Sequence, residues 1–142
     1  MNNAITEFKG EYRFLSNFWM CPVELDGVIY PSSEHAYMAA KTLDVGLRTS
    51  LLGLYPGQAK KQARTFQLRE NWEEIKFDIM YAVVSDKFNR TTSLANALRA
   101  TRSAELIEGN TWGDTIWGVC NGVGENNLGK ILMRVREVQL KK

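Results

Sequence analysis

Apolar and polar positions divide the 142-residue chain into a short β element and several helices. Residues 21–30, CPVELDGVIY, predict a β-hairpin with Asp26-Gly27 at its turn, a dipeptide that two-residue hairpin loops favour. A helix is expected to begin at Pro31-Ser32-Ser33, with a serine as its N-cap, and to run to about Leu43. Further helices are predicted over residues 45–52, 56–66, 71–89 and 92–101, and from about Asn127 onward.

The longest helical pattern, residues 71–89, carries apolar side chains on two nearly opposite sides. Such a helix is expected to be buried between layers, so this one is predicted to be the central core helix. One stripe consists of Trp72, Ile75, Ile79 and Val83, and the other of Phe77, Tyr81, Val84 and Phe88. The whole pattern predicts an α+β fold, mainly helical with a small antiparallel β element, in which residues 1–142 form a single domain.

Residues 109–126, GNTWGDTIWGVCNGVGEN, fit no regular element and contain five glycines and two tryptophans. Long irregular loops in compact domains are usually functional or disordered. Tryptophan side chains rarely lie loose in water, which favours order. We therefore expect an ordered loop that lets backbone and aromatic faces approach a ligand.

Composition narrows the class of protein. A hydrophobic content of 44% and a charged content of 24% are typical of a globular chain, and a net charge of +2 is too small to indicate nucleic-acid binding by itself. The N-terminal stretch MNNAITEFKGEYRF has no apolar signal-peptide core, and no apolar run is long enough to cross a membrane. A cytoplasmic protein with no membrane partner is expected.

Metal-ligating residues are scarce. The chain has two cysteines, Cys21 and Cys120, and one histidine, His35. A zinc site normally needs three or four closely spaced Cys, His or carboxylate ligands, so no metal and no cofactor are predicted. The cysteines are expected to be reduced core residues.

The helix in SSEHAYMAAKTL carries the clearest candidate chemistry. Its alanines cluster with Leu43 on one face, while Glu34, Tyr37, Met38 and Lys41 lie opposite. A carboxylate and an ammonium on a partly covered face are typical of a functional site. The alternative is that Glu34 merely favours the positive N-terminal end of its helix. His35 is expected to be structural or on the surface.

The stretch GENNLGKI, residues 124–131, is one residue away from a phosphate-binding loop. Gly124, Gly129 and Lys130 meet the G-x-x-x-x-G-K spacing, but Ile131 replaces the required Ser or Thr, and no buried strand precedes it. Nucleoside triphosphate hydrolysis is therefore not expected. Asn126, Asn127 and Gly129 lie at a predicted helix start, where free backbone N–H groups can bind an anion.

The stretch FKGEYRFLSNF, near the N-terminus, places Asn17 among aromatic residues. It is either a strand and turn with core aromatics, or a site in which Phe14 and Phe18 sandwich a base while Asn17 bonds its edge. Spacing alone does not decide between the two.

Several motifs in the same order resemble the NADAR superfamily, whose best-known members are the YbiA-like N-glycosidases. The resemblance covers nearly the whole chain and rests on FLSNF (14–18), DGVIYPSSEHAYMAAK (26–41), NWEEIKFDIMYAVVSDKF (71–88), LIEGN (106–110), WGDTIWG (112–118) and NNLGKILMRVRE (126–137). It implies a mainly helical α+β domain that cleaves the C1′–N bond of a ribosylated or ADP-ribosylated base. Relatives act on ribosylamino-pyrimidine phosphates of riboflavin synthesis or remove ADP-ribose from guanine bases, which adds ADP-ribosylated nucleic acid as a possible partner.

The resemblance also implies a set of site residues. Carried over by motif, the pocket candidates are Asn17, Glu34, Tyr37, Lys41, Trp72, Lys87, Trp112, Asp114, Trp117 and Asn127. Phe18 and Gly129 join them as substrate-binding candidates from the patterns described above, and the chemistry of the reaction selects Glu34, Lys41 and Asp114 as the catalytic candidates. Glu34 and Asp114 are the carboxylates available to stabilise the sugar carbon and to protonate the leaving nitrogen. Lys41 offers a second route, through a Schiff base with C1′. A different class of function stays open, a non-catalytic module that binds ADP-ribose, NAD-derived ligands or modified nucleic acid.

The scarcity of metal ligands gives a first prediction. Activity should survive exhaustive treatment with a chelator, because no ligand cluster is expected in the chain. The measurement is turnover before and after chelation. Loss of activity that magnesium or zinc restores would contradict the prediction.

Overall fold

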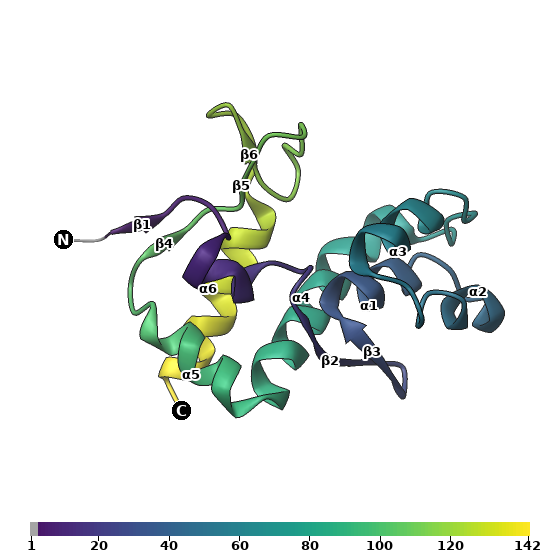
Figure 1. Cartoon of the computed structure of the whole chain (residues 1–142), viewed down its shortest axis with the longest axis horizontal. Helices are drawn as coiled ribbons and strands as arrows, with labels where there is room; N and C mark the ends of the chain where they lie inside the picture. The colour runs from purple at the N-terminus through teal and green to yellow at the C-terminus, as the bar shows by residue number, and fades with distance from the viewer. Residues whose placement is uncertain (1–2) are drawn as a thin grey trace. The chain divides into compact units, whose positions relative to one another are not determined.

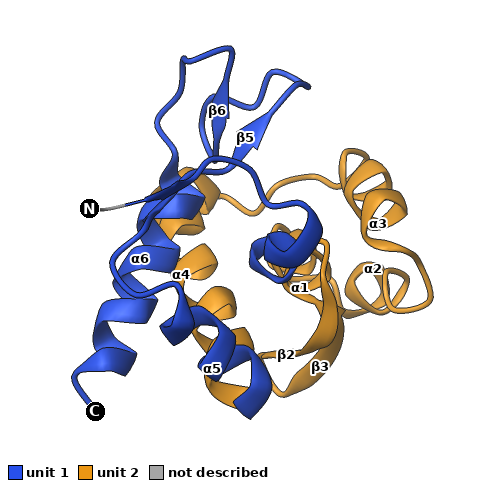
Figure 2. Cartoon of the chain, turned by 60° about the vertical axis from the view of Figure 1, so that its left-hand side comes forward, with its two compact units in different colours: residues 1–16, 91–142 blue, residues 17–90 orange. Residues whose placement is uncertain are grey.

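The computed structural model describes residues 3–142, which form two compact units (Figures 1 and 2). The central unit comprises residues 17–90, and the terminal unit combines both ends of the chain, residues 1–16 and 91–142. Helices dominate both units, and the described residues include three two-stranded sheets. The predicted mainly helical α+β class is therefore confirmed.

The central unit begins with the predicted hairpin. Strand β2 (Met20–Leu25) pairs antiparallel with β3 (Val28–Ser32), and Leu25 lies opposite Val28. Asp26 and Gly27 both have positive φ, +50° and +83°, as a type I′ turn requires. On the other edge of β2, the backbone N–H of Glu24 donates to the Asp86 carboxylate at 2.8 Å, which fixes the hairpin to the long helix.

Four helices follow in the central unit, close to their predicted positions. They are α1 (Ser33–Ala39), α2 (Val45–Thr49), α3 (Pro56–Ala63) and α4 (Trp72–Arg90). Helix α1 is shorter than expected, because the amides of Lys41 and Thr42 bond three residues back and tighten its last turn. Leu43 consequently lies outside the helix and is 66% exposed, so the predicted helix end at about Leu43 is wrong.

Helix α1 is buried along its whole length, and its polar groups are satisfied locally. Ser32 is the predicted N-cap, and its Oγ accepts the His35 N–H at 3.1 Å. The His35 ring lies between Ser32 Oγ at 2.6 Å and the Leu54 carbonyl at 2.7 Å. A carbonyl only accepts, so Nε2 carries the proton and Nδ1 accepts from Ser32. His35 is therefore structural, and burial lowers the pKa of its ring.

Helix α4 is buried mainly in its C-terminal half. Its buried apolar residues there are Met80, Val83, Val84 and Phe88. Near its start only Trp72 is buried, and Phe77 is 40% exposed. The prediction of a helix covered on two sides along its length is therefore wrong for the first half, where charged residues such as Glu73 and Glu74 keep the neighbouring surface in water.

The terminal unit contains the other elements. They are β1 (Ala4–Ile5), a 3₁₀ helix η1 (Gly10–Leu15), α5 (Thr92–Ala100), β4 (Glu105–Leu106), β5 (Gly109–Asn110), β6 (Val119–Cys120) and α6 (Asn127–Leu140). Two parallel pairs, β1 with β4 and β5 with β6, were not predicted. Helices α5 and α6 pack together, and Arg136 on α6 donates to Thr101 Oγ1 at 2.9 Å.

Two expectations concern cysteines and membranes. Cys21 and Cys120 are free thiols, as predicted, but both are half-buried and not in the core. Within residues 3–142, no helix combines the length and apolar character needed to cross a bilayer.

Lys87 is a charged residue buried in the central unit, with none of its side chain exposed. Its Nζ lies 4.9 Å from the centre of the Phe88 ring. Burial lowers the pKa of Lys87 from 10.5 to about 7, and the nearby Cys21 thiol only partly opposes that effect. Near neutral pH this amine is therefore partly uncharged.

The Lys87 pKa makes stability depend on pH. Between about pH 7 and pH 10 the unfolded chain holds the Lys87 proton while the folded chain releases it, so folding is favoured increasingly as pH rises. The free energy of unfolding of the wild type should rise relative to that of Lys87→Met by roughly 1 kcal/mol per pH unit in this window. Below about pH 7 the difference in the free energy of unfolding between the two proteins should not change with pH.

Denaturant titrations at a series of pH values measure this effect. The matched control is Lys61→Met, because Lys61 is exposed. The free energy of unfolding of this variant should change with pH in parallel with that of the wild type. If the wild type and Lys87→Met run parallel across the window, Lys87 titrates normally and the prediction is wrong.

Candidate active site

Glu34 is held at the start of α1 by Asn17, which lies in the N-terminal aromatic stretch FKGEYRFLSNF. Its backbone N–H donates to the Asn17 carbonyl at 3.1 Å. The Asn17 side chain is also occupied, because its Oδ1 accepts from Ser33 Oγ at 2.8 Å and its Nδ2 donates to Met80 Sδ at 3.4 Å. Glu34 and Asn17 are 7% and 8% exposed. The visible role of Asn17 is thus to position Glu34.

The predicted face of α1 gathers further candidates. Tyr37 and Trp72 are both buried, and their ring centres are 5.2 Å apart at an angle of 53°. Lys41 Nζ lies 5.9 Å from the centre of the Tyr37 ring. Glu34 also acts electrostatically on Lys41. One face of the central unit therefore combines the Glu34 carboxylate, the Lys41 amine and the aromatic pair of Tyr37 and Trp72.

Lys41 is half-buried, and its surroundings were only partly predicted. Burial lowers the pKa of the Lys41 ammonium, the Glu34 carboxylate opposes that effect, and Lys60, Arg64 and Lys76 lower the pKa further by repulsion. The three additional cations were missed because they come from other helices. The signal that could have found two of them is the four-residue spacing of Lys60 and Arg64 on α3.

Two more candidates of the central unit make other contacts. Lys87 borders the Phe88 ring and Cys21, and it lies in the helix that carries the bond to the hairpin. Phe18 is half-buried, and its ring comes within 3.8 Å of the place where a side chain on Gly57 would begin. Phe18 therefore packs on the start of α3.

In the terminal unit, Asp114 organises the Gly/Trp loop. Its Oδ1 accepts the backbone N–H groups of Ile116 at 3.1 Å and Trp117 at 2.9 Å. Its own N–H donates to Asn110 Oδ1, and its carbonyl accepts from Asn110 Nδ2. These bonds confirm an ordered loop. They also give Asp114 an evident structural role beside the catalytic one that the motif implies.

A network beneath this loop was missed from the sequence. The Asn110 amide donates to Glu108 Oε2 at 2.9 Å. A side chain on Gly118 would begin 1.8 Å from that Glu108 oxygen and 2.2 Å from the Glu108 carbonyl, so only glycine fits there. The last glycine of WGDTIWG, Gly118, is therefore required by close backbone packing. The motif alone did not distinguish this requirement from a glycine that lets a ligand approach the backbone.

The expectation of free N–H groups at the start of α6 is wrong for its first two residues. The amides of Asn127 and Leu128 donate to the carbonyls of Ile116 and Trp117 at 3.2 and 3.0 Å. Asn127 Nδ2 also donates to the Ile116 carbonyl at 2.8 Å. Gly129 is needed for packing, because a side chain there would begin 2.1 Å from the Leu106 carbonyl. The loop itself occupies the first two backbone donors of α6.

The two tryptophans of the loop differ in exposure. Trp112 is 61% exposed, whereas Trp117 is half-buried with its backbone tied to Asp114. An exposed indole in an ordered loop can stack on the flat ring of a ligand. That is a chemical capacity of Trp112, and its role in substrate binding stays a prediction.

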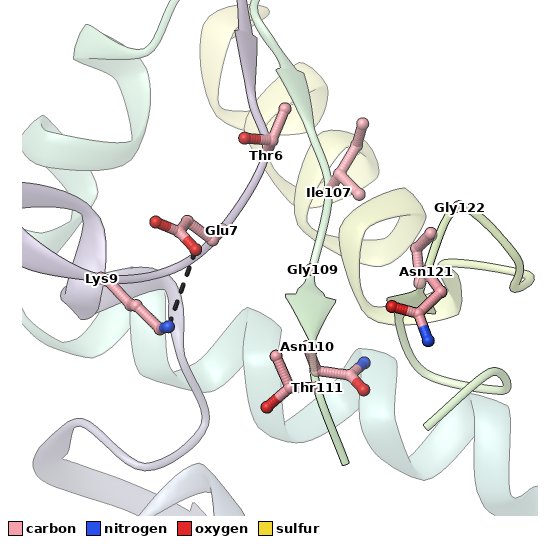
Figure 3. A pocket seen from close by; sticks show the side chains of 10 residues that line it. Thr6, Glu7, Lys9, Ile107, Gly109, Asn110, Thr111, Asn121 and Gly122 are labelled. Atoms are coloured by element: carbon pink, nitrogen blue, oxygen red, sulfur yellow. Dashed lines mark ion pairs between the residues drawn. The ribbon is translucent and has the colours of Figure 1, made fainter. Parts of the chain in front are cut away.

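The terminal unit also has a hollow of about 350 Å³ beside β5 (Figure 3). Polar residues that line it include Glu7, Lys9, Asn110, Thr111 and Asn121, and Glu7 forms an ion pair with Lys9. None of the predicted site residues lines this hollow, so we do not assign it to the candidate active site. Across residues 3–142, no group of three His, Cys, Asp or Glu side chains is arranged to hold a metal ion.

The candidates thus form two groups, one in each unit. The central unit holds Asn17, Phe18, Glu34, Tyr37, Lys41, Trp72 and Lys87, and the terminal unit holds Trp112, Asp114, Trp117, Asn127 and Gly129.

Comparison with known proteins shows the family. A model described as the NADAR domain matches residues 6–140. N-glycosidase YbiA of Escherichia coli (strain K12) is 37% identical over 144 residues, covering 96% of this chain and 89% of that protein. Riboflavin biosynthesis protein VVA0006 of Vibrio vulnificus (strain YJ016) is 41% identical over 128 residues, 87% of this chain but only 35% of that protein.

A solved structure agrees with the sequence matches. The NMR structure of the E. coli protein YbiA aligns with a TM-score of 0.86 and 34% identity, covering 99% of this chain and 88% of that chain. The family match also runs through both compact units. The chain therefore belongs to the NADAR domain family.

Proposed function

We propose that this chain is an N-glycoside hydrolase that cleaves the C1′–N bond of a ribosylated or ADP-ribosylated base. The observation that supports this most directly is Glu34, a carboxylate on α1 that is 7% exposed, together with the partly desolvated Lys41 just after the end of that helix. Relatives named N-glycosidase match nearly the full length of both chains. Together they favour an enzyme over a pure binding module.

The reaction breaks one bond and consumes one water molecule. Hydroxide from water joins C1′, and the remaining proton goes to the nitrogen of the leaving base. Positive charge develops on the sugar carbon before water adds, so a buried carboxylate beside it stabilises the transition state. We assign that role to Glu34, which also accepts the proton of the attacking water. Tyr37 and Trp72 form its aromatic surroundings.

Lys41 supplies a second route to the same products. Burial lowers the pKa of its ammonium, which increases the fraction of free amine that can attack C1′. The amine forms a Schiff base with the opened ribose as the base leaves with a proton, and water later releases the sugar and regenerates the amine. Trapping of a covalent adduct by borohydride separates this route from direct attack by water.

Other parts of the proposal rest on the sequence or on relatives. The substrate is a small ribosylated molecule, either a ribosylamino-pyrimidine phosphate or an ADP-ribosylated guanine, and ADP-ribosylated nucleic acid is the larger alternative. A cytoplasmic location also stays a prediction. Incubation with each substrate followed by mass analysis identifies the leaving base. A non-catalytic module would bind these compounds and release no base.

The first test concerns Glu34. Glu34→Gln keeps the shape of the side chain and removes its charge, so we expect a folded protein that binds its substrate but turns over about 100-fold or more slowly, the usual scale for a positioned acid or base. Melting temperature and single-turnover rates measure the two properties. Turnover within a few-fold of the wild type would make Glu34 a structural residue.

The second test separates the two roles of Asp114. Asp114→Asn keeps the Oδ1 acceptor for the N–H groups of Ile116 and Trp117, whereas Asp114→Ala removes it. We expect fast hydrogen exchange of those two amides only in the alanine variant, and slower turnover, by about 100-fold, in both. If Asp114→Asn turns over like the wild type while Asp114→Ala does not, Asp114 anchors the loop and takes no part in proton transfer.

A further inference from the structure

A group of cations surrounds Lys41 in the central unit. Lys60 lies on α3, Arg64 follows the last residue of that helix, and Lys76 lies on α4. All three repel the Lys41 ammonium, so their charges lie close to it. Helices α3 and α4 both pack on α1 (Figure 1).

Glu34 attracts the Lys41 ammonium, but the charges of Lys60 and Arg64 are poorly compensated. Residues 56–69 contain four cationic side chains and no Asp or Glu. Within residues 3–142, no carboxylate lies within 4.0 Å of the charged nitrogens of Lys41, Lys60 or Arg64, whereas Lys76 pairs with Glu73. Holding like charges together costs free energy unless an anion joins them.

The positions of the two key cations are set by the helix. Lys60 and Arg64 are four residues apart, so they lie on the same face of α3, beside the buried Ala59 and Ala63. Lys60 is half-buried and Arg64 exposed. Lys61, one residue further along, is exposed and does not contribute to the repulsion of Lys41. Lys60 and Arg64 therefore act electrostatically on Lys41, whereas Lys61 does not.

We infer that Lys60 and Arg64, with Lys41, bind the phosphate carried by the 5′-oxygen of the reacting ribose. This rests on the proposed function. Both candidate substrates share that group, as a monophosphate in the ribosylamino-pyrimidine and as the first phosphate of the diphosphate in ADP-ribose. Glu34 and Lys41 are seven residues apart, about 10 Å along a helix axis, which suits a ribose with C1′ at one end and its phosphate at the other. Arg64 supplies the planar guanidinium that pairs well with phosphate.

Direct binding tests this site without any cleavage. Ribose 5-phosphate and ADP-ribose are titrated by calorimetry into the wild type, Lys60→Gln, Arg64→Gln and the matched control Lys61→Gln. Removal of one charge-assisted hydrogen bond should raise the Kd of both ligands by about 10-fold in the first two variants. Lys61→Gln should stay within about twofold of the wild type. Melting curves show that each variant is folded.

Kinetics give a second readout. With a phosphorylated substrate, Lys60→Gln and Arg64→Gln should raise KM by about 10-fold and change kcat little. With the same substrate after removal of its phosphate, both variants should match the wild type in kcat/KM. Equal losses on both substrates would place the two cations in another role and overturn the inference.

Failure of this inference is distinguishable from failure of the proposed function. If the variants bind both ligands as the wild type does, if Lys61→Gln weakens binding equally, or if the wild type binds neither ligand, the phosphate site is wrong whatever the catalytic result. If ribose 5-phosphate binding depends on Lys60 and Arg64 but no substrate is cleaved, the site stands and the hydrolase proposal fails.

Discussion

The cost of removing charge from water is the constraint on which the central unit depends. Helix α1 is buried along its entire length, yet it begins with Glu34 and is followed by Lys41. A buried carboxylate is tolerated only where neighbouring groups satisfy it and hold it in place. Ser32 caps the helix and bonds the His35 ring, so these polar groups beside the candidate carboxylate of Glu34 are satisfied within the buried helix.

Two asparagines position the residues that carry the candidate carboxylates. Asn17 accepts the amide of Glu34 through its carbonyl and anchors its own side chain on Ser33 and Met80. In the terminal unit, Asn110 brackets Asp114 with two hydrogen bonds. An amide offers a donor and an acceptor on a short, stiff arm, so it can fix backbone and side chain together. Asn17 thus positions the backbone of Glu34, and Asn110 positions the backbone of Asp114, whose Oδ1 also accepts two N–H groups of its loop.

Short stretches of sequence predicted the features that depend only on neighbouring residues. The Asp26-Gly27 turn and the Ser32 cap follow from backbone preferences of a few residues, and both are confirmed. Non-local features were missed. The amides at the start of α6 are occupied by carbonyls ten or more residues earlier, and nothing in GENNLGKI indicates that. The cations around Lys41 come from separate helices, so no motif contains them.

The same electrostatics link phosphate binding to the choice between the two catalytic routes. Burial and three neighbouring cations lower the pKa of Lys41, which favours its uncharged, nucleophilic form. A phosphate dianion bound among those cations would act in the opposite direction and favour the ammonium. A phosphorylated substrate would thus push Lys41 toward the role of an acid or an electrostatic partner, leaving the attack on C1′ to water beside Glu34. The Schiff-base route would be strongest for a ribose without phosphate, because only then do the cations keep Lys41 free to attack.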